Sequence, residues 1–351
     1  MLTSIIAFII LIAICVLFHE YGHYITARLL GVQVHEFAFG MGPVVFQRVS
    51  RKGATRMLWS WRLLPIGGFC RLAGMGEELE DEIVLSGMGF NEQPAWKRFL
   101  ILLNGSLFNV ILALILTVFF LCGYGVLDME STRIGEIMSG FPSEQAGLQV
   151  GDQITAVNGK TVSHWREMSE ALRDEGGKKA PVSLDVLRDG KTFNLELLIP
   201  VNKEYGRPML GVSPSMRRYG FIEAVGSSAG YTWRMSKLML RGVVDWILQR
   251  QEVEVTGPIG IASMSGRAMR EGLWSFVSFL ALISLNLGLL NLFPIPALDG
   301  GRILFVLLEM LLRRRLPEKV ENWIHAAGFV VLIFLMLLIT CQDVYHLFWT
   351  K

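Results

Sequence analysis

The residues with the clearest chemistry stand in the stretch FHEYGHYI, residues 18–25, inside an otherwise apolar N-terminal segment. On a helix, His19 and His23 are separated by four residues and project from one face. Two imidazoles placed in this way can bind one metal ion at roughly 2.0–2.1 Å, and Glu20 can act as a general base on water. Chance occurrence is the alternative, but ionisable groups at membrane depth are costly and rarely idle. The stretch predicts a metal site with His19 and His23 as ligands and Glu20 as catalytic residue.

A catalytic zinc site needs a third protein ligand and one open position. The other histidines lie in predicted soluble segments or near the ends of the last apolar stretch: His35, His164, His325 and His346. Asp299 fits better, because a helix from Leu2 descends about 26 Å to His19, and the third apolar stretch reaches Asp299 at a similar depth. Asp299 can also cap the helix that follows it, and the two roles are compatible.

The elements that must position these residues are membrane helices. The chain has 351 residues, 52% hydrophobic and 18% charged, and its mean hydropathy is +0.44. This composition is typical of a multi-span membrane protein. The predicted transmembrane helices are 1–30, 99–126, 273–312 and 323–349, each long enough for a hydrocarbon core about 30 Å thick. In the third, NLFPIPALDGG (291–301) breaks the helix, which membrane depth tolerates only where the freed backbone faces protein or a wet cavity.

The flanking charges predict the orientation. Residues 31–98 hold eight basic residues and the third span is followed by three arginines, so both loops are predicted to be cytoplasmic. Both termini and residues 127–272 are then extracytoplasmic. The first span lacks a basic leading region and a cleavage site, so we interpret it as retained. A net charge of +2 without a basic stripe argues against a nucleic-acid partner, and the four scattered cysteines predict no disulfide framework.

Three segments lie outside the spans. Residues 31–98 predict a β-hairpin or small sheet, with strands near 33–39, 44–49, 56–63 and 67–72. It is either a plain cytoplasmic loop or a sheet edge that meets substrate. Residues 214–272 contain an amphipathic helix, 219–250, predicted to lie on the outer membrane surface. A fifth span is the rival interpretation, and the charges in this stretch disfavour it.

Residues 127–213 predict one small α/β domain. Tight turns are indicated at Asn158-Gly159 and Asp189-Gly190, the second between two strands. The run GFPSEQAGLQVGDQITAVNG (140–159) resembles the corresponding run of bacterial PDZ domains. The predicted fold is therefore a multi-pass α-helical membrane protein with four transmembrane helices, a cytoplasmic-side membrane-associated β-hairpin or sheet, and one extracytoplasmic PDZ-like domain.

These motifs together resemble the site-2 protease family of intramembrane zinc metalloproteases, and within it the bacterial proteases that regulate sigma-E. The resemblance rests on H-E-x-x-H in the first span, the PDZ-like run, and N-x-x-P-x-P-x-L-D-G at 291–300. It implies one Zn²⁺ held by His19, His23 and Asp299, with Glu20 as acid and base. It also implies that Asn291 holds the substrate backbone. The best-known members carry two PDZ domains, whereas this chain has room for one.

The resemblance further implies roles for Gly40 and Gly42, which match the membrane-associated hairpin that pairs with unwound substrate. The substrate would be a type II single-span membrane protein already trimmed outside, similar to an anti-sigma factor. Its cleavage in the bacterial inner membrane would release a stress response. The PDZ-like domain would bind peptide C-termini or exclude bulky substrates.

Two other functions fit parts of the sequence. One is a PDZ-containing membrane scaffold or chaperone with a non-catalytic metal site, against which the intact H-E-x-x-H and L-D-G motifs argue. The other is a membrane-anchored zinc protease that acts at the soluble face. Such enzymes usually take a glutamate from a later helix as third ligand, and the surroundings of Asp299 argue otherwise.

Overall fold

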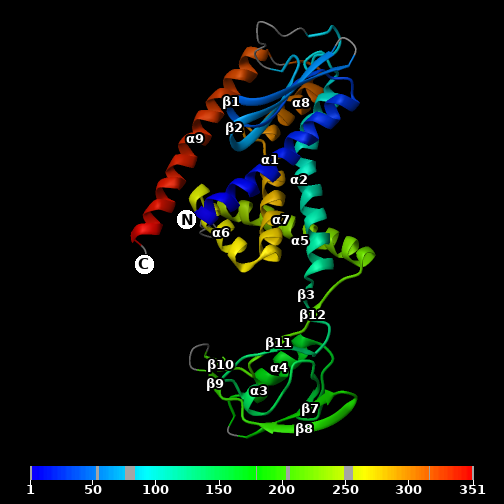
Figure 1. Cartoon of the computed structure of the whole chain (residues 1–351), viewed down its shortest axis with the longest axis vertical. Coiled ribbons are helices and arrows are strands. Elements are labelled where there is room, and N and C mark those ends of the chain that lie inside the picture. The colour runs from blue at the N-terminus through cyan, green and yellow to red at the C-terminus, as the bar shows by residue number, and fades with distance from the viewer. Residues whose placement is uncertain are drawn as a thin grey trace. The chain divides into compact units, whose positions relative to one another are not determined.

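The computed structural model describes residues 2–52, 55–75, 84–178, 180–202, 206–248, 256–315 and 317–349. They form two compact units (Figure 1), one of Met1–Phe120 with Ala224–Lys351 and one of Leu121–Glu223. The first unit contains the long apolar helices and the two longest strands. The second contains the short strands predicted at 127–213.

The described residues of the first unit form the helices α1 (Leu2–Leu29), α2 (Ala95–Gly123), α5 (Phe221–Ile247), α6 (Pro258–Glu271), α7 (Leu273–Leu290), α8 (Asp299–Leu312) and α9 (Glu318–Trp349). Among the described residues, four helices are long and apolar enough to cross a membrane, namely α1, α2, α7 and residues Lys319–Tyr345 of α9. The sequence predicted four spans in these places; three have ends that differ by a few residues, whereas the third, predicted as 273–312, is a candidate span only over Leu273–Leu290.

The third predicted span is interrupted as its prolines suggest. Helix α7 ends at Leu290 and α8 begins at Asp299, with residues 291–298 between them in turns. Pro294 and Pro296 cannot donate backbone hydrogen bonds, so the helical ladder stops there. The break turns the chain so that Asp299 stands at the first turn of a new helix.

Helix α5 occupies the segment predicted as an amphipathic surface helix. It is not among the helices apolar enough to span a membrane. Its buried positions recur every four residues and are small, namely Ala224, Ser228, Thr232 and Ser236. The large apolar side chains Ile222, Trp233 and Leu238 are exposed. The predicted helix 219–250 extends to residues 249 and 250, which lie outside the described part.

The region predicted as four short strands forms two long, bent ones, β1 (Val34–Lys52) and β2 (Thr55–Leu72). Their register contains three runs: residues 34–39 pair with 68–72, residues 36–39 pair also with 58–61, and residues 44–52 pair with 55–62. The bends occur where Gly40, Gly42 and Gly67 have φ between 82° and 86°, a backbone region in which glycine has no steric penalty. The predicted breaks between strands are therefore bends within them.

The second unit is centred on a sheet of order β6-β5-β7-β8. Its elements are β3 (Val126–Leu127), β4 (Ile134–Ile137), α3 (Pro142–Gln145), β5 (Gln153–Val157), β6 (Lys160–Thr161), α4 (Trp165–Glu175), β7 (Val182–Arg188), β8 (Lys191–Leu197), β9 (Val201–Asn202), β10 (Arg207–Pro208), β11 (Val212–Pro214) and β12 (Met216–Arg217). Asn158 and Asp189 have positive φ, each followed by a glycine that does too, which confirms both predicted tight turns.

Candidate metal centre

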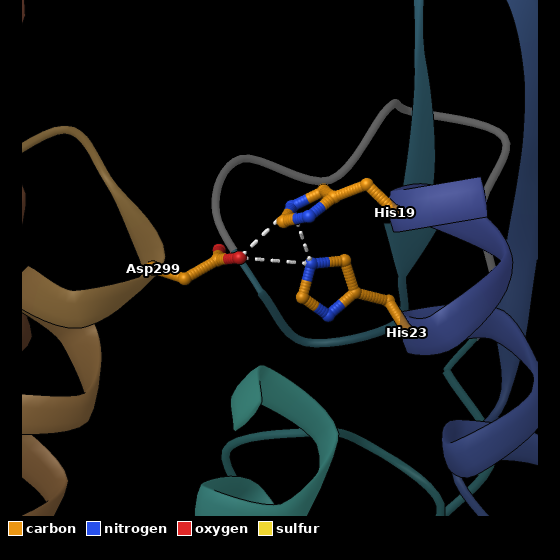
Figure 2. A group of neighbouring side chains, drawn as sticks. All are labelled: His19, His23 and Asp299. Carbon is orange, nitrogen blue, oxygen red and sulfur yellow. Dashed lines mark hydrogen bonds and ion pairs between the residues drawn. The ribbon is translucent and has the colours of Figure 1, made fainter. Parts of the chain in front are cut away.

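Three polar side chains from distant parts of the chain converge within the first unit (Figure 2). His19 Nε2 lies 3.0 Å from Asp299 Oδ2, and His23 Nε2 lies 3.1 Å from the same oxygen. The two Nε2 atoms are 3.2 Å apart, and the rings meet nearly at right angles. The structure thus brings together the three residues that the sequence predicts as ligands.

Helix geometry and the α7–α8 break position these side chains. His19 and His23 are one turn apart on α1, and Figure 2 shows Asp299 reaching toward them from the opposite side. Asp299 does not cap α8, because Leu298 occupies the N-cap position and no side chain bonds to the cap amides. The alternative role of Asp299 as a helix cap is therefore wrong, and its carboxylate is directed to the histidines.

The arrangement fits a tetrahedral zinc ion. Ligand atoms at ~2.0–2.1 Å from a tetrahedral ion stand about 3.3 Å from one another. The three atoms here are separated by 3.0, 3.1 and 3.2 Å. Two imidazole nitrogens and one carboxylate oxygen are a donor set used by catalytic zinc sites, with one position left for water or substrate. These residues can hold the ion with little rearrangement.

Helix α2 contacts both histidines of the metal centre. His23 Nδ1 donates to the Ile101 carbonyl oxygen at 2.8 Å, which leaves Nε2 with a lone pair facing the site. Gly105 lies against both rings, since a Cβ built there would overlap His23 and come within 3.0 Å of His19 Cε1. Gly22 on α1 faces the Asn104 backbone equally closely. Small residues thus let the two helices approach, and a backbone carbonyl fixes the tautomer of His23.

Glu20 is held by the sheet. Its Oε2 accepts a hydrogen bond of 2.9 Å from the backbone amide of Cys70 in β2. Cys70 pairs with Phe37 in the sheet, and its amide reaches Glu20 on α1. The other carboxylate oxygen of Glu20 remains available for proton transfer. Glu20 follows His19 directly in the sequence, and the Cys70 amide holds one of its carboxylate oxygens. Together these two features fix where the Glu20 carboxylate can act.

The predicted substrate-binding residues lie in two places. The Asn291 side-chain amide is 3.5 Å from His19 Nδ1, beside the metal group. Gly40 and Gly42 lie instead at the bend of β1, where Gly40 approaches the Leu64 carbonyl and the Arg62 guanidinium donates to Gly42 O at 2.9 Å. Their contacts belong to the sheet, and their role toward substrate stays a prediction.

The remaining histidines divide by environment. His35 is buried in β1, and His164 is exposed at the N-cap of α4, where it forms a capping box with Glu167. His325 is buried on α9, with Nδ1 accepting the Ala297 amide at 3.0 Å. The side chain of His346 lies outside the described part. None of the three described ones belongs to the His19–His23–Asp299 group.

Sequence reasoning missed the groups that support the site. The carbonyl of Ile101 and the amide of Cys70 are backbone groups without a side-chain signal. Gly105 has a weak signal, as a glycine inside a predicted transmembrane helix, where close packing is the usual reason. For His325, the sequence indicates only a place near one end of the last predicted span.

Two histidines on a helix long and apolar enough to cross a membrane, with an aspartate of α8 facing them, form a donor set of the kind that catalytic zinc sites use. The family comparison agrees, since residues 7–335 match the model of "Peptidase family M50". The chain therefore belongs to peptidase family M50, the site-2 protease family. Its special likeness to proteases that regulate sigma-E stays a prediction.

Curated relatives match the chain from end to end. A protein of Fusobacterium nucleatum is 34% identical over 346 residues, covering 97% of this chain and 98% of the relative. A protein of Rickettsia conorii is 31% identical over 359 residues, covering 98% and 99%. Both carry the name "Putative zinc metalloprotease". Family and relatives together make this chain a zinc metalloprotease that acts on membrane proteins.

Solved structures resemble a quarter of the chain. The PDZ domain of an SdrC-like protein of Listeria innocua covers 26% of this chain and 99% of its own, with 14% identity and a TM-score of 0.22. That of the Listeria monocytogenes protein covers 25% and 84%, with 20% identity and a TM-score of 0.19. Assignment of the 121–223 unit to the PDZ fold rests on its sequence run and stays a prediction.

Proposed function

We propose that this chain is an intramembrane endopeptidase that cuts a peptide bond within or near the transmembrane segment of a single-span membrane protein. The observation that carries the proposal is the convergence of His19 and His23 on α1, a candidate membrane span, with Asp299 at the end of the break that follows α7, another candidate span. We assign the three as ligands of one zinc ion. A site built at this depth meets substrates where they cross the bilayer.

Zinc bound there supplies Lewis acidity, which activates water at neutral pH and polarises the scissile carbonyl. Glu20 accepts the proton from the attacking water and delivers it to the leaving amine. The Cys70 amide holds one oxygen of Glu20 and so directs the other toward the reacting atoms. The Asn291 carboxamide, beside His19, holds the substrate backbone or the developing oxyanion.

The sheet has a separate task in this proposal. A peptide bond in a transmembrane helix is shielded by its own hydrogen bonds, so the substrate must unwind before it is cut. Pairing an extended segment with a sheet edge replaces the lost backbone partners. We assign this role to the β1–β2 sheet around Gly40 and Gly42, whose bend is fixed by Arg62.

The finer assignments follow the sequence resemblance. The substrate is a type II protein already trimmed outside, of the anti-sigma-factor kind, and the chain lies in the bacterial inner membrane. Both termini and residues 127–272 are extracytoplasmic, and the β1–β2 sheet is cytoplasmic. The 121–223 unit, as a PDZ-like domain, binds peptide C-termini and excludes substrates with a bulky outer domain.

The test is cleavage of single-span model substrates by the full chain in lipid nanodiscs, with the cut position read by mass spectrometry. We expect a cut within or next to the transmembrane segment, faster when the substrate's outer domain has been removed. Glu20→Gln should keep its zinc and lose about 10²–10⁴-fold in rate. Unchanged cleavage by Glu20→Gln, or cuts confined to soluble loops, would refute the proposal.

The filter is tested by deleting residues 131–213. If the 121–223 unit excludes bulky substrates, the deletion should abolish the preference for trimmed over full-length substrate while cleavage of the trimmed one continues. The membrane scaffold, as the other candidate, predicts that Glu20→Gln changes nothing.

A further inference from the structure

In the break between α7 and α8, one backbone amide donates its hydrogen bond to a residue outside the loop. From 291 to 298 the amides of Asn291, Leu292, Phe293, Ile295 and Leu298 donate to carbonyls within the loop or at the end of α7. Pro294 and Pro296 have no amide proton. Ala297 donates instead to Nδ1 of His325 on α9, at 3.0 Å. The backbone hydrogen bonding of the unwound segment is thus complete only when the His325 side chain accepts from Ala297.

The surroundings of Ala297 make that bond important. Ala297 is a non-glycine residue at φ 79°, a conformation that needs support from its neighbours. It stands two residues before Asp299, and Gly300 donates to the Asn291 carbonyl at 2.7 Å. The segment that carries Asn291 and Asp299 is therefore one closed loop, and the amide at its strained point is held from another helix.

His325 is equally unusual on its own helix. It is the one buried residue of α9 among those whose side chains the structure describes. The ring packs edge-on against Phe305, and its Nε2 is buried with no partner among the described residues. Because the Ala297 amide donates to Nδ1, the ring proton resides on Nε2. His325 therefore binds the loop through one acceptor atom, Nδ1.

Helix α9 is anchored at two polar points. Near its start, His325 holds Ala297, and Gly328 lies so close to Pro296 that a Cβ would overlap it. Near its end, Asp343 accepts the amides of Gly257 and Gly260 at the start of α6. Between these points its large side chains, such as Phe334 and Leu337, are exposed, and Figure 1 shows α9 (red) along the flank of this unit.

We propose that His325 is a positioning residue of the metal centre: its Nδ1 fixes the Ala297 amide and thereby the places of Asp299 and Asn291 opposite His19 and His23. The inference rests on the proposed function, since it concerns the same site. It makes α9 part of the catalytic unit, although α9 supplies neither a ligand nor the general base.

The experiment compares variants that keep or remove the acceptor at Nδ1. His325→Asn places its side-chain oxygen near Nδ1, His325→Leu removes the acceptor, and the milder His325→Gln moves it toward Nε2. Asn322→Leu, an exposed polar-to-apolar change on the same helix, is the matched control. Zinc retained against a graded chelator is measured by metal analysis, and kcat and KM are measured on a model substrate.

We expect His325→Leu and His325→Gln to lose zinc at roughly ten-fold lower chelator concentration, with kcat falling roughly 10- to 100-fold and KM little changed. His325→Asn and Asn322→Leu should stay near the wild type. The inference is overturned if His325→Asn is as impaired as His325→Leu, since ring packing would then matter and not the acceptor. It is also overturned if His325→Gln and His325→Leu keep zinc and kcat while Asp299→Asn has lost both.

If His325→Leu does not fold, hydrogen exchange on the full chain decides between the remaining variants. The peptide containing Ala297 should be protected in the wild type and in His325→Asn, and should exchange faster in His325→Gln. Equal protection in all three would overturn the inference.

Discussion

Each of the two units holds a carboxylate in its interior, and the two differ in how they are satisfied: Asp152 is buried, whereas Asp299 is half-buried with its Oδ2 atom shielded from solvent. Asp152 in the 121–223 unit accepts hydrogen bonds from Arg188 Nε at 2.6 Å, from Arg188 again at 2.7 Å, and from the Gln149 amide at 2.8 Å. Asp299 in the helical unit faces His19 and His23, and within the described part of the chain its Oδ2 has no hydrogen-bond donor beyond those rings.

The difference separates a structural acid from a ligand. Asp152 has a permanent cation and an amide as partners, so it needs nothing more, and its role is to tie a loop to β7. Among the residues that the structure describes, Asp299 is paired only with two rings that can be neutral, so a cation placed among the three groups would complete it. The identity of the donors around each carboxylate distinguishes these roles.

The largest expected effect contrasts the same substitution at the two sites. Asp299→Asn should abolish stoichiometric zinc and lower cleavage by at least about 10³-fold, since it removes a charged ligand. Asp152→Asn should keep both zinc and cleavage. Metal analysis of the two purified variants together with a cleavage assay is the measurement. Equal zinc content in Asp299→Asn and Asp152→Asn would contradict the assignment of different roles to the two carboxylates.

A smaller effect is expected at Gly105, where α2 approaches the histidine rings. Gly105→Ala forces His23 and His19 to move and should lower zinc affinity roughly 10- to 100-fold. The matched control is Gly242→Ala in α5, where a Cβ has nothing within 4 Å. That change should leave zinc untouched and stabilise the helix by up to ~1 kcal/mol. Wild-type zinc affinity in Gly105→Ala would show that the rings have more room than the structure gives them.

The next effect concerns stability in the 121–223 unit. Asp152→Asn removes a charged acceptor of three hydrogen bonds and should cost about 2 kcal/mol in the free energy of unfolding. Hydrogen exchange on the full chain localises the loss, because amides of β5 and β7 should exchange faster while those of α1 and α2 do not change. Faster exchange throughout the helical unit would argue against separate roles for the two carboxylates.

The smallest expected effect is the pH dependence of the stability difference between the wild type and Asp152→Asn. Burial raises the pKa of the Asp152 carboxyl, but the bonds from Arg188 and the Gln149 amide lower it more, so the net pKa lies below its ordinary 3.8. A depressed folded-state pKa gives stability that is present above 3.8 and lost as pH falls through the folded-state value. The wild-type advantage over Asp152→Asn should therefore be constant near neutrality and shrink below that pH. A constant gap down to pH 2 would contradict the assignment.

Much of the architecture could be predicted because it is encoded locally. Four apolar runs predict four helices that can cross a membrane, and the two prolines of 291–298 predict the break between α7 and α8. The Asn158-Gly159 and Asp189-Gly190 pairs predict their turns. The four strand segments predicted within residues 31–98 lie in β1 and β2, where glycines give bends in place of the predicted breaks.

For the site, the sequence alone determined that His19 and His23 share a face, since helical periodicity fixes the relation of residues four apart. It also singled out Asp299, through its place after a broken helix. Only the tertiary structure decided which groups surround them: the Ile101 carbonyl, the Cys70 amide, Gly105 and His325. Two are backbone groups present at every residue, and all four arrive from distant segments, so no local pattern of side chains marks them. Their role comes from the packing of helix on helix and sheet, which the chain acquires only when it folds.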